Sequence, residues 1–116
     1  MIGIAEIRRY AMALPEVSEA KHFKLPAFKV RDKTFVVIQK GSTHAIVSVD
    51  ETQAADAAAR DPHAYQVLRR NNGRIFVGVR IDLAKASGAR VRDLIEQAWR
   101  HKAPKGLSAA TKVSRR

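Results

Sequence analysis

The spacing of apolar residues divides the chain into helical and extended segments. Apolar positions recur at helical intervals over residues 2–14 and again over about residues 89–102, which predicts two amphipathic helices, one near each end of the sequence. Asp50 and Gln53 form a capping-box pattern ahead of an alanine-rich run. This pattern predicts a third helix, which ends before Pro62.

Extended segments fill most of the remaining sequence. Residues 25–49 are rich in β-branched and aromatic side chains, and turn residues interrupt them at 31–33 and 40–43, which predicts a three-stranded antiparallel meander. A later segment shows the clearest alternation of apolar and polar residues and predicts a fourth strand. Residues 17–23 fit a short edge strand, whereas residues 63–70 fit a short helical turn. The predicted strands are residues 27–30, 34–39, 45–49 and 74–81.

The same alternation predicts which face of each strand meets the core. Phe28 and Val30 are expected to face the core, with Lys29 and Arg31 on the other face, and Trp99 is expected to anchor the last helix in the core. In the fourth strand, the core set is Ile75, Val77, Val79 and Ile81, and the opposite set is Arg74, Phe76, Gly78 and Arg80. The predicted fold class is α+β: an antiparallel sheet, made of the meander and one later strand, with N-terminal and C-terminal helices packed on it.

Size and composition fit one small globular domain. The chain has 116 residues, 46% of them hydrophobic, and we expect a single domain over residues 1–104 and a basic, disordered tail over residues 105–116. There is no cysteine, which excludes disulfides and thiolate metal sites. No apolar run approaches the roughly 20 residues of a membrane span, and Glu6, Arg8 and Arg9 argue against a signal peptide. We therefore expect a cytoplasmic protein without a membrane partner.

The charge is strongly basic and unevenly distributed. The formal net charge is +11, and the residues from Gln97 onward contribute +6 of it without a single acidic side chain. A balance of this size favours contact with a polyanion such as DNA or RNA, an acidic partner or an anionic surface. The alternative is that excess lysine and arginine only keep a small protein soluble.

No motif points to catalysis or to a bound cofactor. The four histidines lack metal-ligand spacing, no serine lies in a Gly-x-Ser-x-Gly turn, and no glycine-rich phosphate-binding pattern occurs. We therefore expect no catalytic, cofactor-binding or metal-binding residues, and a protein that is not an enzyme. A cluster of perturbed titratable groups in a cleft would reverse that expectation.

Basic residues around the predicted fourth strand and at the end of the last helix are the candidate nucleic-acid contacts. A sheet face with arginines and an aromatic ring could hold phosphates and stack a base. The alternative is that this face is solvated, or covered by a helix or a second subunit with Phe76 buried. The candidate residues are Lys29, Arg31, Arg69, Arg70, Arg74, Phe76, Arg80, Arg100, Lys102 and Lys105.

Several short segments carry a family resemblance. They are Leu14-Pro15-Glu16-Val17-Ser18-Glu19, Pro26-Ala27-Phe28-Lys29-Val30, Lys33-Thr34-Phe35-Val36, Gly78-Val79-Arg80-Ile81-Asp82, and Trp99 with Ala103-Pro104-Lys105. Together they resemble the MmcQ/YjbR-like family over roughly residues 4–107. The sequence departs from that family at Glu16, where glycine is common, which suggests a different turn conformation.

The resemblance implies a fold and a function. The implied fold is the CyaY-like α+β arrangement, with helices packed on an antiparallel sheet. Members of the family are commonly labelled DNA-binding because of their similarity to winged DNA-binding elements, and there are no catalytic residues to carry over.

The sequence therefore predicts a monomeric or weakly dimeric, non-enzymatic domain that binds nucleic acid through phosphate contacts with little sequence readout. The alternative is a protein-interaction or small-ligand module whose pocket lies between the sheet and the last helix.

Overall fold

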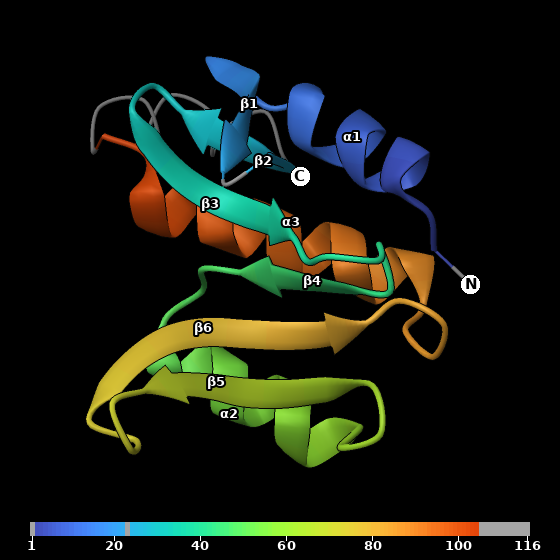
Figure 1. Cartoon of the computed structure of the whole chain (residues 1–116), viewed down its shortest axis with the longest axis vertical. Helices are drawn as coiled ribbons and strands as arrows, with labels where there is room; N and C mark the ends of the chain where they lie inside the picture. Colours follow the sequence, from blue (N-terminus) through green and yellow to red (C-terminus); the bar gives the residue numbers. More distant parts are fainter. Residues whose placement is uncertain (1, 23, 105–116) are drawn as a thin grey trace.

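The computed structural model describes residues 2–22 and 24–104, and Figure 1 shows its helices and strands. Lys105 and the rest of the predicted tail lie outside the described residues. In chain order the elements are α1 (Ile4–Met12), β1 (Val17–His22), β2 (Leu25–Val30), β3 (Lys33–Ile38), β4 (His44–Val47), α2 (Glu51–Arg60), β5 (Tyr65–Arg70), β6 (Ile75–Asp82) and α3 (Gly88–Lys102). The three predicted helices and four predicted strands are all present, with boundaries within about two residues of those expected.

The strands form one six-stranded antiparallel sheet in the order β1-β2-β3-β4-β6-β5. The predicted meander is confirmed as β2, β3 and β4, and β1 extends it as the edge strand considered for residues 17–23. β6 pairs with β4, and β5 forms the opposite edge of the sheet. The α+β fold class is therefore confirmed, although the sheet has two strands more than the sequence clearly predicted.

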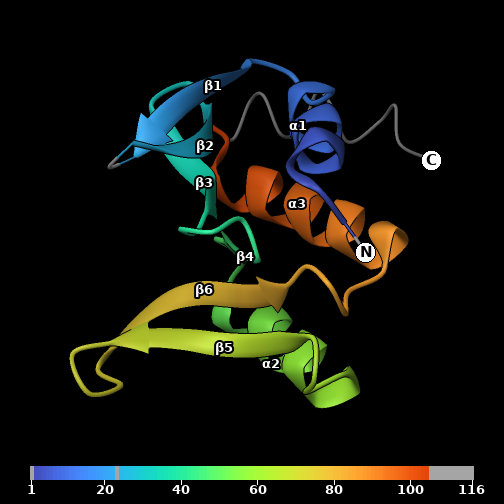
Figure 2. The same ribbon diagram turned by 45° about the vertical axis from the view of Figure 1, so that its right-hand side comes forward.

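All three helices cover the same face of this sheet (Figure 2). α1 contacts β1, β2 and α3, while α3 lies across β3 and β4. α2 packs separately on the hairpin formed by β5 and β6. The opposite sheet face carries no helix of the described chain, so its outward side chains are available for contact with a partner.

Trp99 anchors the core between α3 and the sheet, as the sequence predicted. Its side chain is fully buried, and its indole Nε1–H donates a hydrogen bond of 3.0 Å to the carbonyl oxygen of Pro15. Phe28 and Phe35 are fully buried in the same core. Because side chains fill the interface between α3 and the sheet, the grooves described below lie beside it rather than in it. A smaller pocket of about 230 Å³ lies where the end of α3 meets the β2–β3 turn, so the small-ligand pocket between the sheet and the last helix stays a prediction.

Residues 63–70 do not form the short helical turn that the sequence suggested. Most of this segment is β5, in which Tyr65 and Val67 pair with Ile81 and Val79 of β6. The error came from the three-residue spacing of Tyr65 and Leu68, which imitates a helical period. The hairpin with β6 prevails because it gives the backbone of both strands their hydrogen bonds.

A β-bulge in β6 changes which of its side chains face the helices. Leu68 pairs with Gly78, but the next residue, Arg69, pairs with Phe76, so Val77 is an extra residue in β6. Before the bulge, Phe76 packs against the core on the helix side. At the bulge, Val77 turns to the open face of the sheet.

The predicted faces of β6 are therefore only half right. Val79 and Ile81 are fully buried in the core, as expected. Phe76 and Val77 are exchanged between the two faces, and Ile75 is 50% exposed rather than buried. Simple alternation failed here because it assumes an unbroken strand, and the bulge shifts the register by one residue.

Gly78 sits where the chain leaving β4 passes close to β6. A Cβ atom on Gly78 would lie 2.4 Å from the carbonyl oxygen of Val47 and 3.2 Å from the Cα atom of Ser48. Only a residue without a side chain fits against this backbone. This close approach of backbone accounts for a glycine in the interior of β6.

Candidate nucleic-acid interface

The sheet face without helices carries a groove of about 490 Å³, which we call the open-face groove. Its centre is formed by Val37 and Ile46, which are cross-strand neighbours on β3 and β4. Both lie on the opposite side of their strands from Val36 and Val47, which are buried in the core. The lining residues are Leu25, Thr34, Val37, Gln39, Lys40, Ile46, Ser48, Arg70 and Val77.

The open-face groove combines an apolar floor with positive charge. Val37, Ile46 and Val77 are partly buried and form the floor, whereas Lys40 and Arg70 are exposed. No carboxylate is among the residues that line the groove. An anionic, partly apolar ligand therefore meets attraction here without repulsion from the groove itself.

Arg80 extends the positive charge along the sheet. Its guanidinium Nε–H donates a hydrogen bond of 2.7 Å to Oε1 of Gln39, a groove residue. Arg80 also borders a smaller pocket that contains His44, Asp82 and Lys85. Asp82 lies 3.9 Å from the ring nitrogen Nε2 of His44 and 3.9 Å from Nζ of Lys85, so this end of the face includes a carboxylate.

The β5–β6 hairpin presents two arginines at its tip. Arg70 ends β5 and Arg74 precedes β6, and both are exposed. Asn71, Asn72 and Gly73 make the turn between them with φ angles of 52°, 56° and 88°. Asparagine and glycine tolerate this left-handed backbone better than other residues, which accounts for the Asn-Asn-Gly sequence of the turn. Arg74 therefore lies in the turn rather than in the strand.

Arg69 and Phe76 do not belong to the open face. The guanidinium of Arg69 forms an ion pair with Glu51 of α2, and its Cζ atom lies 5.7 Å from the ring centre of Phe76. Both side chains therefore lie on the helix side of the sheet. The prediction that Phe76 shares a face with Arg80 is wrong, because the bulge reverses its direction. The open-face groove consequently has no aromatic platform for stacking a base.

Arg31 is neutralised by Glu16. Two hydrogen bonds of 2.6 and 3.1 Å join the guanidinium to the carboxylate. The hydrogen bond from Arg31 holds the pKa of Glu16 below its ordinary value, and the same bond raises the pKa of Arg31. Glu16 has a φ of 58°, in the left-handed region that favours glycine.

The remaining candidates are divided between the two sides of the molecule. Lys29 points to the open face, since its neighbours Phe28 and Val30 are buried in the core. Arg100 forms an ion pair of 3.7 Å with Glu96 on the surface of α3. Lys102 ends α3 and lines a different pocket, beside the β2–β3 turn. It is not among the residues that line the open-face groove.

Lys40 is the groove cation that the sequence did not single out. It follows β3, the central strand of the meander, and it was treated only as part of a turn. Its position just after a strand was the sequence feature that could have marked it as a surface cation beside the sheet. It lines the same groove as Arg70 only because β6 pairs with β4, and no local pattern in the sequence shows that pairing.

These features define a class of protein: an α+β domain whose antiparallel sheet is covered by helices on one face and carries a basic groove on the other. A model of the YjbR family matches residues 12–101, and the chain belongs to this family. The resemblance found in the sequence is thereby confirmed.

A solved structure shares the fold. The crystal structure of Deinococcus radiodurans protein DR2400, which carries a DUF419 domain, superimposes with a TM-score of 0.73 at 16% sequence identity. The similarity covers 97% of this chain and 87% of the Deinococcus chain. No curated protein matches the sequence.

The structure also bears on metals and membranes. Within residues 2–22 and 24–104, no group of three or more histidine, aspartate or glutamate side chains is arranged to hold a metal ion. No helix of the described chain is long and apolar enough to cross a membrane.

Proposed function

We propose that the open-face groove binds the backbone of a nucleic acid. The observation that carries this proposal is a groove of about 490 Å³ with exposed Lys40 and Arg70, an apolar floor and no carboxylate in its lining. Arg74 at the adjacent hairpin tip and Lys29 on the same sheet face extend the positive surface. None of these four cations forms an ion pair within the described part of the chain.

The chemistry of the groove favours phosphate contact over base recognition. Lysine and arginine neutralise phosphates and release counterions, which gives affinity without sequence choice. The apolar floor of Val37, Ile46 and Val77 accommodates sugar or base surfaces, but it lacks the aromatic rings that stack bases in single-strand binders. We therefore expect little discrimination between sequences.

The salt dependence of binding follows from the number of cations. If about four lysine and arginine side chains contact phosphates of a duplex, affinity should fall roughly 100-fold between about 50 and 200 mM salt. Replacing two of them should reduce the slope of log affinity against log salt by about 2.

The test is fluorescence anisotropy with labelled double-stranded and single-stranded DNA and RNA. The variant Arg70→Gln/Arg74→Gln removes two charges beside the groove, and the matched control Arg9→Gln/Arg92→Gln removes two from α1 and α3 on the helix-covered side. A third variant, with the four cations from Lys105 to Arg116 changed to glutamine, measures the contribution of the tail.

The proposal predicts that only the groove variant loses both affinity and salt slope. Equal losses in the groove and control variants would show that binding follows net charge alone. Loss confined to the tail variant, or no binding by the unmodified chain at low salt, would refute the groove as the site.

A further inference from the structure

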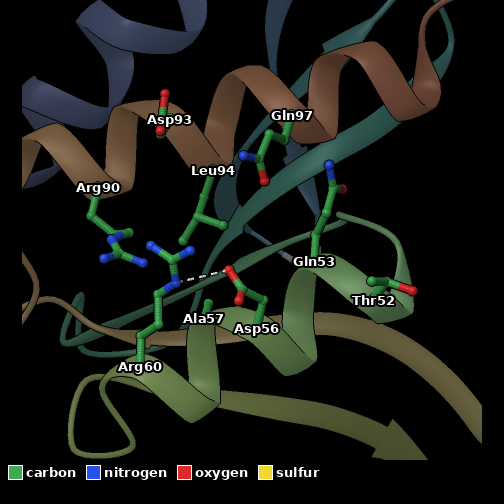
Figure 3. A pocket seen from close by; sticks show the side chains of 9 residues that line it. All are labelled: Thr52, Gln53, Asp56, Ala57, Arg60, Arg90, Asp93, Leu94 and Gln97. Carbon is green, nitrogen blue, oxygen red and sulfur yellow. Dashed lines mark ion pairs between the residues drawn. The ribbon is translucent and has the colours of Figure 1, made fainter.

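A second groove, of about 480 Å³, lies between α2 and α3 on the helix-covered side of the sheet (Figure 3). We call it the interhelical groove. α2 packs on β5 and β6 while α3 packs on β3 and β4, so the two helices lie side by side over different strands. Ala57 and Leu94 face each other at its floor, and the short alanine leaves space above the sheet. The lining residues are Thr52, Gln53, Asp56, Ala57, Arg60, Arg90, Asp93, Leu94 and Gln97.

One end of the interhelical groove is cationic. The guanidinium groups of Arg60 and Arg90 reach into the same space from opposite helices (Figure 3). Arg60 is paired with Asp56 at 3.1 Å, whereas Arg90 has no carboxylate partner within the described residues. The Cζ atom of Arg90 lies 5.9 Å from the ring centre of the buried Tyr65, which supports the guanidinium from one side.

Two guanidinium groups share this end with one carboxylate, so one positive charge is left unbalanced and a bound anion would neutralise it. Asp56 supplies only one carboxylate to this end and is already engaged by Arg60. Asp93 borders the groove, but its side chain points away from the other lining residues in Figure 3. The cationic end is therefore suited to a phosphate group, which two arginines can hold by several charge-assisted hydrogen bonds.

The other end of the groove offers neutral hydrogen-bonding groups. Gln53 of α2 and Gln97 of α3 extend their amides into it from opposite sides (Figure 3). The Oε1 atom of Gln53 accepts a hydrogen bond of 3.3 Å from the backbone N–H of Asp50, which leaves its amide N–H groups to donate elsewhere. Thr52 adds a hydroxyl group to this end.

Each helix contributes one arginine and one glutamine to the groove, at the same spacing along the helix. Gln53 and Arg60 are seven residues apart on α2, and so are Arg90 and Gln97 on α3, which places each pair on one face of its helix. Because the helices run antiparallel in Figure 3, arginine faces arginine and glutamine faces glutamine. A rise of about 1.5 Å per residue separates the cationic and amide ends by roughly 10 Å.

We propose that the interhelical groove binds a nucleoside monophosphate. The phosphate lies between Arg60 and Arg90, the sugar lies over Ala57 and Leu94, and the base presents its hydrogen-bonding edge to the amides at the far end. Gln97 carries both N–H donors and a carbonyl acceptor, and Gln53 adds its N–H donors, so these amides can pair with the edge of a purine or a pyrimidine. This site is separate from the open-face groove and does not depend on nucleic-acid binding there.

The test is isothermal titration calorimetry of the full chain with four probes. Adenosine 5′-monophosphate and uridine 5′-monophosphate contain both recognition groups, whereas inorganic phosphate and adenosine each contain one. We expect at least one monophosphate to bind at least tenfold more tightly than either phosphate or adenosine. Arg60→Gln and Arg90→Gln should each weaken that binding at least tenfold, and Gln97→Ala should weaken it without changing phosphate binding.

Arg92→Gln is the matched control, because Arg92 lies on α3 outside the interhelical groove. Circular dichroism melts of each variant separate loss of the site from loss of the fold. Binding no tighter than that of phosphate, or binding that survives both arginine substitutions, would overturn the proposal. The same holds if Arg70→Gln/Arg74→Gln abolishes nucleotide binding, since the ligand would then occupy the open face.

Discussion

Replacing Gly78 by alanine tests the packing where β4 meets β6. The added Cβ atom would lie 2.4 Å from the backbone carbonyl oxygen of Val47, whereas ordinary van der Waals contacts begin near 3.4 Å. The obstacle is backbone rather than the tip of a flexible side chain. The strand ends must therefore move apart by about 1 Å, which strains the ladder between Val47 and Val79.

The expected loss follows from two opposing effects. Forcing an extra carbon into a packed site costs about 1–3 kcal/mol. Alanine also restricts the unfolded chain, which stabilises a protein by about 0.4–1 kcal/mol where the native backbone accepts it. Distortion of adjacent ladder hydrogen bonds adds to the cost, so we expect Gly78→Ala to lower the free energy of unfolding by about 2 kcal/mol. For a domain of this size, that corresponds to a melting temperature roughly 10 °C lower.

Thermal and urea unfolding, followed by circular dichroism, measure this loss. The matched control is Gly3→Ala, because no heavy atom lies within 4 Å of a Cβ there and φ is −107°. We expect the control to change stability by less than about 1 kcal/mol, since position 3 is only a helix cap. If Gly78→Ala is as stable as the unmodified chain, or no less stable than the control, the explanation for this glycine is wrong.

Three further predictions concern the core, a helix cap and an ion pair. Trp99→Phe leaves the Pro15 carbonyl without its donor, and urea unfolding should show a loss of about 2 kcal/mol; an unchanged midpoint would mean that water replaces the indole. Asp50→Ala removes the 2.8 Å cap of α2 and should cost about 1 kcal/mol in the same assay, whereas Asp50→Asn should restore most of it. The lowered pKa of Glu16 means that its bond to Arg31 stabilises the fold above the ordinary glutamate pKa and is lost as pH falls through the folded-state value. The stability difference between Glu16→Gln and the unmodified chain should therefore shrink toward low pH; a difference independent of pH would refute this linkage.

The helices could be predicted from the sequence because their signals are local. The helical spacing of the apolar residues in α3 can be read from that stretch of sequence alone. The five residues concerned are all buried: Val91, Leu94, Ile95, Ala98 and Trp99. The cap of α2 at Asp50 forms as its sequence pattern indicated. The meander was similarly accessible, since consecutive strands joined by short turns need only alternation and turn residues.

The errors arose where distant parts of the chain decide the outcome. β5 became a strand because it pairs with β6, and Phe76 moved to the helix side because β6 contains one extra residue opposite Arg69. The open-face groove could be predicted from the sequence only in part. Alternation separates Val37 from Val36 and Ile46 from Val47, but only the β4–β6 pairing brings Arg70 to the same groove as Lys40.

The β4–β6 pairing has a consequence for how the chain folds. Among the described strands, every other ladder joins neighbours in the sequence, but this one joins residues 44–47 to residues 79–82 across α2 and β5. The β1–β4 meander and the β5–β6 hairpin can each form from short loops, whereas closing the seam between them costs more chain entropy. We expect this seam to form late in folding and to open first under native conditions, so that the two parts of the sheet exchange their amide protons as separate units. Gly78 lies at this seam, and a methyl group there would meet the backbone of Val47 and Ser48 across it, so Gly78→Ala should hinder closure of the seam.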